Sequence, residues 1–179
     1  MKSKLILIIL SFVTLTFAQK TDYTKEPGYF EFGNLPFGEK IEPITEINIE
    51  EPLLKMMSNM VNNKDSNFSE LIGSIKLIRV SEYELKSLSK EALSNKINTI
   101  DKELLNKNWE RIVKTKSGKN IVNIYVKPDA NKGYSGLVIT SIDNNKVSFV
   151  NIVGKIDLTT VGKLSEQFNI PSIDSLKHK

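Results

Sequence analysis

Hydrophobic residues recur along the chain with two different periods, and each change of period marks the start of a new element. Positions 44–50 alternate between polar and apolar residues, which predicts a strand whose inward side carries Ile47 and Ile49. Pro52 suits the first turn of a helix, where its missing N–H costs nothing. The residues that follow are apolar at helical spacing and predict an amphipathic helix: Leu53, Met56, Met57, Met60 and Val61. We interpret these methionines as core packing and not as an adaptable binding surface.

Two further helices and a strand follow in the same way. Asn67 and Glu70 have the spacing of a capping box, and the apolar residues around them predict a short helix. Positions 76–85 alternate well enough for a strand. Ser89 then caps a longer helix, whose apolar stripe continues to about Asn106.

Four strand-like stretches come next and are separated by turn-forming residues. They occupy positions 109–116, 120–127, 134–143 and 146–154. The separators include Ser117-Gly118 and Asn144-Asn145, which are typical of tight turns. We therefore predict a C-terminal antiparallel meander of four strands.

One more amphipathic segment follows the last predicted strand. Asp157 caps it, Pro171 stops it, and its apolar stripe is expected to face the sheet: Leu158, Val161, Leu164 and Phe168. The order of all these elements predicts an α+β fold, a mostly antiparallel sheet with helices packed on one face.

The first eighteen residues have the pattern of a secretory signal peptide. A basic start precedes the mainly apolar positions 5–17, a stretch shorter than the roughly 20 residues of a membrane-spanning helix. We expect cleavage between Ala18 and Gln19. The sequence contains no Cys, so no disulfide forms and no lipid-modified Cys follows the cleavage site. The expected product is a soluble exported protein, periplasmic or secreted, without a membrane anchor.

The chain after positions 1–18 divides into three parts. Positions 19–43 contain three glycines and three prolines with little periodicity, which indicates an extended, aromatic-rich arm. Positions 44–171 form a single α+β domain, and the tail at 172–179 is expected to be loose. In that tail, Asp174-Ser175-Leu176 resembles the O-glycosylation acceptor of exported Bacteroidota proteins, which makes Ser175 a candidate modification site.

Charge argues against a nucleic-acid partner. Removal of Lys2 and Lys4 with the signal peptide lowers the formal charge from +4 to +2. The remaining lysines are spread along the chain without a run. Neither the charge pattern nor the expected compartment favours nucleic-acid binding.

The chain offers little for catalysis or metal binding. Its one histidine, His178, lies close to the C-terminus, and there is no cysteine, so neither a nucleophile–base pair nor a zinc site is expected. The acidic turns at 129–132 and 143–146 lack the ligand spacing of a calcium loop. We predict no catalytic residue, no cofactor and no metal site.

The two arginines are the first candidates for ligand contact. Arg79 and Arg111 are the only arginines of the chain, and both lie in predicted strands. A guanidinium holds a carboxylate in two bonds, which an ammonium does not. They form ion pairs with Glu82, Glu84 or Glu110, or they bind an acidic ligand.

Aromatic residues of the arm are the second candidates. Tyr29, Phe30, Phe32 and Phe37 lie close together, and positions 29–32 have the pattern of a short edge strand before a glycine. These rings close one edge of the core, or they supply contact area to a partner.

Several short segments occur in a set order over residues 28–171. They are Gly28-Tyr29-Phe30-Glu31-Phe32-Gly33, Glu46-Ile47-Asn48-Ile49, Pro52-Leu53-Leu54, Ile78-Arg79-Val80, Asn108-Trp109-Glu110-Arg111, Ile124-Tyr125-Val126-Lys127-Pro128, and Val150 to Leu158 with Gly162-Lys163-Leu164. Together they resemble the Bacteroidota family called domain of unknown function 4252. The resemblance implies an exported single domain and transfers no catalytic residue.

These observations lead to one hypothesis and two alternatives. The hypothesis is a non-enzymatic, periplasmic or secreted binding module whose partner is a protein or a small acidic ligand. A hydrolase that uses carboxylates alone is one alternative, with Glu50-Glu51 or Glu82 and Glu84 as the available pairs. A structural component of the envelope or of adhesion is the other.

Overall fold

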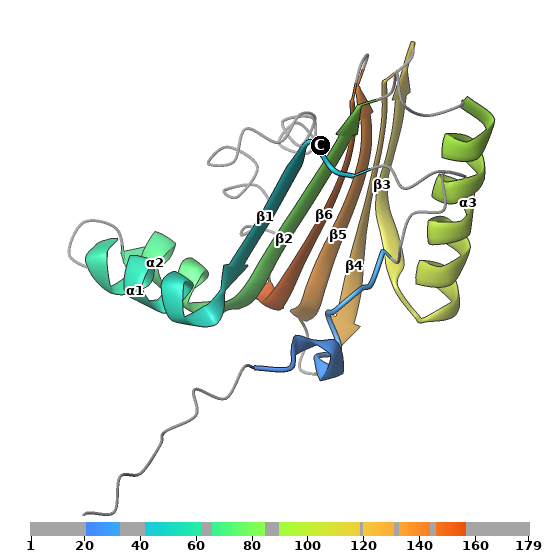
Figure 1. Cartoon of the computed structure of the whole chain (residues 1–179). Coiled ribbons are helices and arrows are strands. Elements are labelled where there is room, and N and C mark those ends of the chain that lie inside the picture. The colour runs from blue at the N-terminus through green and yellow to red at the C-terminus, as the bar shows by residue number, and fades with distance from the viewer. Residues whose placement is uncertain are drawn as a thin grey trace, which may run out of the picture.

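An antiparallel sheet of six strands runs through the centre of the molecule (Figure 1). The computed structural model describes residues 21–32, 42–61, 66–84, 90–118, 120–130, 133–143 and 146–156. Its strands are β1 (Thr45–Glu50), β2 (Ile75–Glu84), β3 (Glu110–Ser117), β4 (Asn120–Asp129), β5 (Gly133–Asp143) and β6 (Lys146–Ile156). They lie across the sheet in the order β1-β2-β6-β5-β4-β3.

The predicted C-terminal meander is confirmed. β3, β4, β5 and β6 pair in sequence order, each antiparallel to the next. β2 then pairs with the free side of β6, and β1 pairs with β2. β1 and β3 are therefore the two outer strands.

The helices begin and end close to where the apolar periodicity predicts them. They are α1 (Glu51–Val61), α2 (Ser66–Ser74) and α3 (Lys90–Asn106), with a short 3-10 helix at Tyr23–Lys25. α1 follows β1 without a loop, and α2 runs straight into β2. The α+β class is confirmed.

The described helices cover both faces of the sheet. Leu54 of α1 and Ile72 of α2 belong to a core cluster that contains Val150 of β6. Leu104 of α3 belongs to a second cluster that contains Phe149. Successive residues of a strand point to opposite faces, so we name these the α1–α2 face and the α3 face. The prediction that helices pack on one face is wrong, because strands with apolar residues on both sides need cover on both.

The N-terminal arm is part of the fold. Residues 21–32 lie on the α3 face of the sheet, and Figure 1 shows them in blue at its lower end, near β4. Phe30 is 1% exposed and packs against Trp109, and Phe32 is 8% exposed and packs against Phe149. Positions 29–32 form no strand, so that prediction is wrong. The backbone N–H of Phe30 donates instead to the Asn151 side chain.

The methionines of α1 differ from the sequence interpretation. Met57 packs against the core, as expected, but Met56 is 54% exposed and Met60 is 71% exposed. Ile47, predicted to face inward, is also mostly outside the core. Core packing is therefore the wrong interpretation for two of the three methionines.

Several predictions fall on residues outside the described ranges. They concern the signal peptide with Ala18 and Gln19, Phe37, the helix after Asp157, Ser175 and His178. Within the described ranges, no helix has both the length and the apolar character needed to cross a membrane.

Candidate functional site

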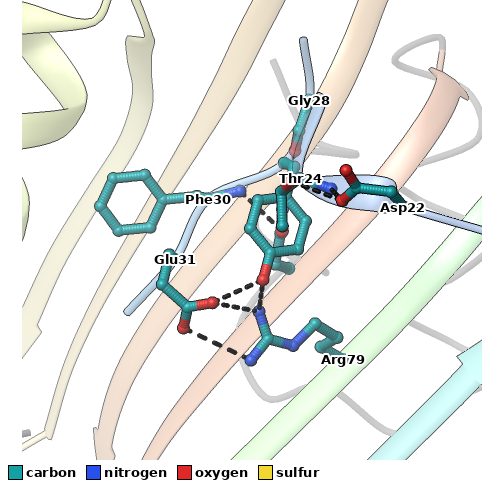
Figure 2. A network of polar contacts seen from close by, with 8 residues as sticks. Asp22, Thr24, Gly28, Phe30, Glu31 and Arg79 are labelled. Carbon is teal, nitrogen blue, oxygen red and sulfur yellow. Dashed lines mark hydrogen bonds and ion pairs between the residues drawn. The ribbon is translucent and has the colours of Figure 1, made fainter. Parts of the chain in front are cut away.

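Arg79 holds the arm onto the sheet. It lies on β2, opposite Asn48 on one side and Asn151 on the other. Its Nη1 donates to the Tyr29 hydroxyl at 2.6 Å and to Glu31 Oε2 at 3.3 Å, while Nη2 approaches Glu31 Oε1 at 3.5 Å (Figure 2). The guanidinium carbon also lies 5.3 Å from the centre of the Tyr29 ring, a cation–π distance.

Tyr29 completes this contact as a neutral hydroxyl. It accepts from Arg79 and donates to Glu31 Oε2 at 2.5 Å. Burial raises the pKa of Tyr29, and the bond to the Glu31 carboxylate raises this pKa further. The donors of Arg79 are thus directed to groups of the protein itself, and its side chain is only 23% exposed.

Asn151 fixes the backbone of the arm below this ion pair. It is fully buried on β6, and its Oδ1 accepts the Phe30 N–H at 2.9 Å. Its Nδ2 donates to the carbonyl oxygens of Gly28 at 3.0 Å and Leu137 at 3.2 Å. A side chain thereby supplies the hydrogen bonds that a neighbouring strand would supply. Sequence reasoning missed Asn151, although an amide within the apolar run Phe149 to Val153 is an available signal.

Arg111 of β3 holds α3 onto the sheet, as Arg79 holds the arm. Its Nη1 donates to Asp101 Oδ1 at 2.6 Å, and the Tyr125 hydroxyl donates to the same oxygen at 2.8 Å. Burial raises the pKa of Tyr125 well above its usual range, and the bond to Asp101 adds to this. The three side chains join α3 to β3 and β4. The arginine partners are Glu31 and Asp101, so the expected pairing with Glu82, Glu84 or Glu110 is wrong.

Arg79→Lys is expected to lower the free energy of unfolding by about 1 kcal/mol, because an ammonium replaces the planar fork on Tyr29 and Glu31. Urea unfolding measures this loss. Lys25→Gln is the control, since the pair of Lys25 with Asp22 is largely exposed and should contribute nothing measurable. Unchanged stability together with loss of a captured partner would instead assign Arg79 to binding.

Two of the four carboxylates considered for hydrolysis, Glu51 and Glu82, form ion pairs with lysines of the protein. Glu82 accepts from Lys146 Nζ at 3.2 Å and from Ser148 Oγ at 3.3 Å, whereas Glu84 is exposed at the end of β2. Glu50 is exposed, and Glu51 pairs with Lys55. Among the described residues, no three His, Cys, Asp or Glu side chains are placed to hold a metal ion.

The exposed apolar residues gather on β1 and α1. Six large hydrophobic side chains of the described ranges are exposed, and five of them lie just before β1, on β1 or on α1. We call these five the β1–α1 surface: Ile44, Ile47, Leu53, Met56 and Met60. The sixth is Leu105. On α1, Leu54 and Met57 face the core, while Leu53, Met56 and Met60 form a second stripe on the outside. This helix is therefore apolar on two sides.

Comparison with known proteins places the chain in a family. No significant match is found among curated proteins or among solved structures. The family described as "Domain of unknown function (DUF4252)" matches residues 37–164, which include all three α-helices and all six strands described above. The chain therefore belongs to the DUF4252 family.

Proposed function

We propose that this protein is an exported, non-enzymatic binding module that contacts a partner protein through the β1–α1 surface. The observation that carries the proposal is the outward stripe of α1, where Leu53, Met56 and Met60 are 44%, 54% and 71% exposed. Three large apolar side chains on one side of a helix that already has a buried side are not needed for packing.

A protein partner fits this surface better than a small acidic ligand. The guanidinium groups that would recognise a carboxylate, Arg79 and Arg111, already bond to Glu31 and Asp101. The outward stripe of α1 has the spacing with which an amphipathic helix enters an apolar groove. Methionine side chains adapt to such grooves because they are unbranched and polarisable.

Export is part of the proposal and has its support in the sequence. A basic start, an apolar stretch and the small residues before Gln19 have the pattern of a cleaved signal peptide. Such a protein meets its partners outside the cytoplasm. The N-terminal residue of the protein recovered from the periplasm or the medium tests this directly, with Gln19 expected.

Met56→Glu combined with Met60→Glu is expected to abolish partner binding and leave the fold intact. Both side chains are exposed, so the free energy of unfolding should change by less than about 0.5 kcal/mol. A photocrosslinking residue placed at position 53 of the exported protein captures the partner. The yield of the crosslinked complex should fall at least about tenfold in the double variant.

Leu105→Glu is the matched control, because Leu105 is 46% exposed but lies on α3, away from β1 and α1. Crosslinking from position 53 should persist in this variant. If the double variant and the control retain the same crosslinked partner with the same yield, the β1–α1 surface is not the binding site.

A further inference from the structure

The two outer strands of the sheet carry opposite charges on the same face. Glu46 and Glu50 of β1 share a strand side with Asn48, which is paired with Arg79, and therefore point to the α3 face. Lys114 and Lys116 of β3 are paired with Asn123 and Ile121 of β4, on the strand side that also carries Tyr125 of the α3-face cluster. We name these the acidic edge (Glu46, Glu50) and the basic edge (Lys114, Lys116).

All four charged side chains are exposed. None forms an ion pair with another described residue. Arg111 lies on the same side of β3 but is held by Asp101. The acidic and basic edges thus contrast with both arginines, whose charges are neutralised within the molecule.

Each outer strand pairs on one side only among the described strands. The other side presents backbone N–H and C=O groups that can bond a further strand. Charged side chains on an outer strand commonly prevent it from pairing with the same strand of another copy. Here two acidic edges repel each other, and so do two basic edges, but an acidic edge and a basic edge attract.

The order of the strands lets the acidic edge of one copy meet the basic edge of another while the α3 faces of both copies lie on the same side. The six strands alternate in direction, so β1 and β3 run in opposite directions. A second copy shifted sideways, without being turned over, therefore brings its β3 antiparallel to β1. Its α3 face then lies on the same side of the sheet as the α3 face of the first copy.

One register satisfies both faces of such a junction. With Glu46 opposite Lys116, Asn48 lies opposite Lys114, and Glu50 lies diagonally from Lys114, within reach of a long side chain. On the α1–α2 face, the same register sets Ile47 opposite Thr115 and Ile49 opposite Val113. These are β-branched pairs, which favour strand pairing.

We propose that copies of this chain associate head to tail, the acidic edge of one copy pairing with the basic edge of the next to extend the sheet. The contact is heterologous, so each copy keeps one acidic and one basic edge available and open-ended assemblies form. The charges set the direction of addition and exclude association of like edges. This self-association covers Ile47 of the β1–α1 surface but leaves the outward stripe of α1 (Leu53, Met56, Met60) free for the partner protein.

The test uses the exported form of the full chain in sedimentation velocity over a range of concentrations. The wild-type protein should form species that grow with concentration at low salt and dissociate at high salt. Glu46→Lys with Glu50→Lys gives two basic edges, and Lys114→Glu with Lys116→Glu gives two acidic edges. Each double variant alone should associate roughly tenfold or more weakly than wild type.

Mixing the two double variants should restore association, because each then meets an edge of opposite charge. The variant with all four changes should associate with itself as wild type does. Circular dichroism confirms that each variant is folded, which is expected for substitutions at exposed positions. The proposal is overturned if wild type stays monomeric at low salt and high concentration, or if either double variant associates as strongly as wild type.

Discussion

Replacing Asn151 by leucine lowers the free energy of unfolding by roughly 3 to 5 kcal/mol. The substitution keeps the approximate volume but leaves the Phe30 N–H and the Gly28 carbonyl without their buried partner. Each buried group left without a partner costs about 1 to 3 kcal/mol. If the arm detaches so that water satisfies these groups, the burial of Phe30 and Phe32 is lost instead, and the cost is of similar size.

Asn123→Leu is the matched control for this prediction. Asn123 is also buried in the sheet, at 4% exposure, but its one described bond is to the Thr140 hydroxyl at 3.3 Å. Asn123→Leu removes only one donor to a hydroxyl oxygen, so a loss of about 1 kcal/mol is expected. Urea unfolding gives both values, and hydrogen exchange of the Phe30 amide distinguishes a docked from a detached arm. Wild-type stability and protection in Asn151→Leu would show that the arm does not depend on this amide.

Local patterns predict the elements of this fold well because periodicity is a local property. α1, α2, α3 and the meander follow from apolar spacing and from turn residues such as Ser117-Gly118 and Asn144-Asn145. The pairing of β2 with β6 does not follow from such local patterns. Three strands lie between β2 and β6 in the sequence, and nothing within either strand specifies this neighbour. Docking of the arm is harder still, since Phe30 and Asn151 are 121 residues apart.

The partners of the arginines show how strand geometry restricts a sequence argument. Glu82 and Glu84 come three and five positions after Arg79, and Glu110 is next to Arg111. Each of these acids therefore points to the face of its strand opposite to that of the arginine. The carboxylates that pair with the arginines come from other elements that cover the α3 face, the arm and α3. The alternation of side chains along a strand excludes the expected partners, but it does not identify Glu31 and Asp101 as the actual ones.

The exposed stripe of α1 marks another limit of sequence patterns. Helical spacing shows that a helix has apolar residues at Leu53, Leu54, Met56, Met57 and Met60, but these positions span two sides of the helix. Which side faces the sheet depends on how α1 leaves β1. The structure assigns Leu54 and Met57 to the core and leaves the other side exposed, and this is the side on which the proposed function depends.

Gly28→Ala is expected to release the arm and to lower the free energy of unfolding by about 4 kcal/mol or more. A Cβ at position 28 would overlap the carbonyl oxygen of Ser135 and lie 2.7 Å from the Cα of Gly136. Both atoms belong to the backbone of β5, which is held by β4 on one side and β6 on the other. Because β5 cannot move away, the arm must, and Phe30 then loses its place beneath α3.

Gly133→Ala provides the comparison that separates this steric effect from a general sensitivity of β5 to alanine. A Cβ at position 133 would have the Ile156 carbonyl oxygen as its nearest neighbour, at an ordinary 3.6 Å, so stability should change by less than about 1 kcal/mol. Gly136→Ala, whose Cβ would lie 2.5 Å from the Gly28 Cα, should behave like Gly28→Ala, because it closes the same gap from the other side. Proteolysis within residues 21–32 should accelerate in both of these variants and not in Gly133→Ala. Equal stability of all three variants would mean that the arm does not need this close backbone contact, and the loss expected for Asn151→Leu would then have to arise within the sheet alone.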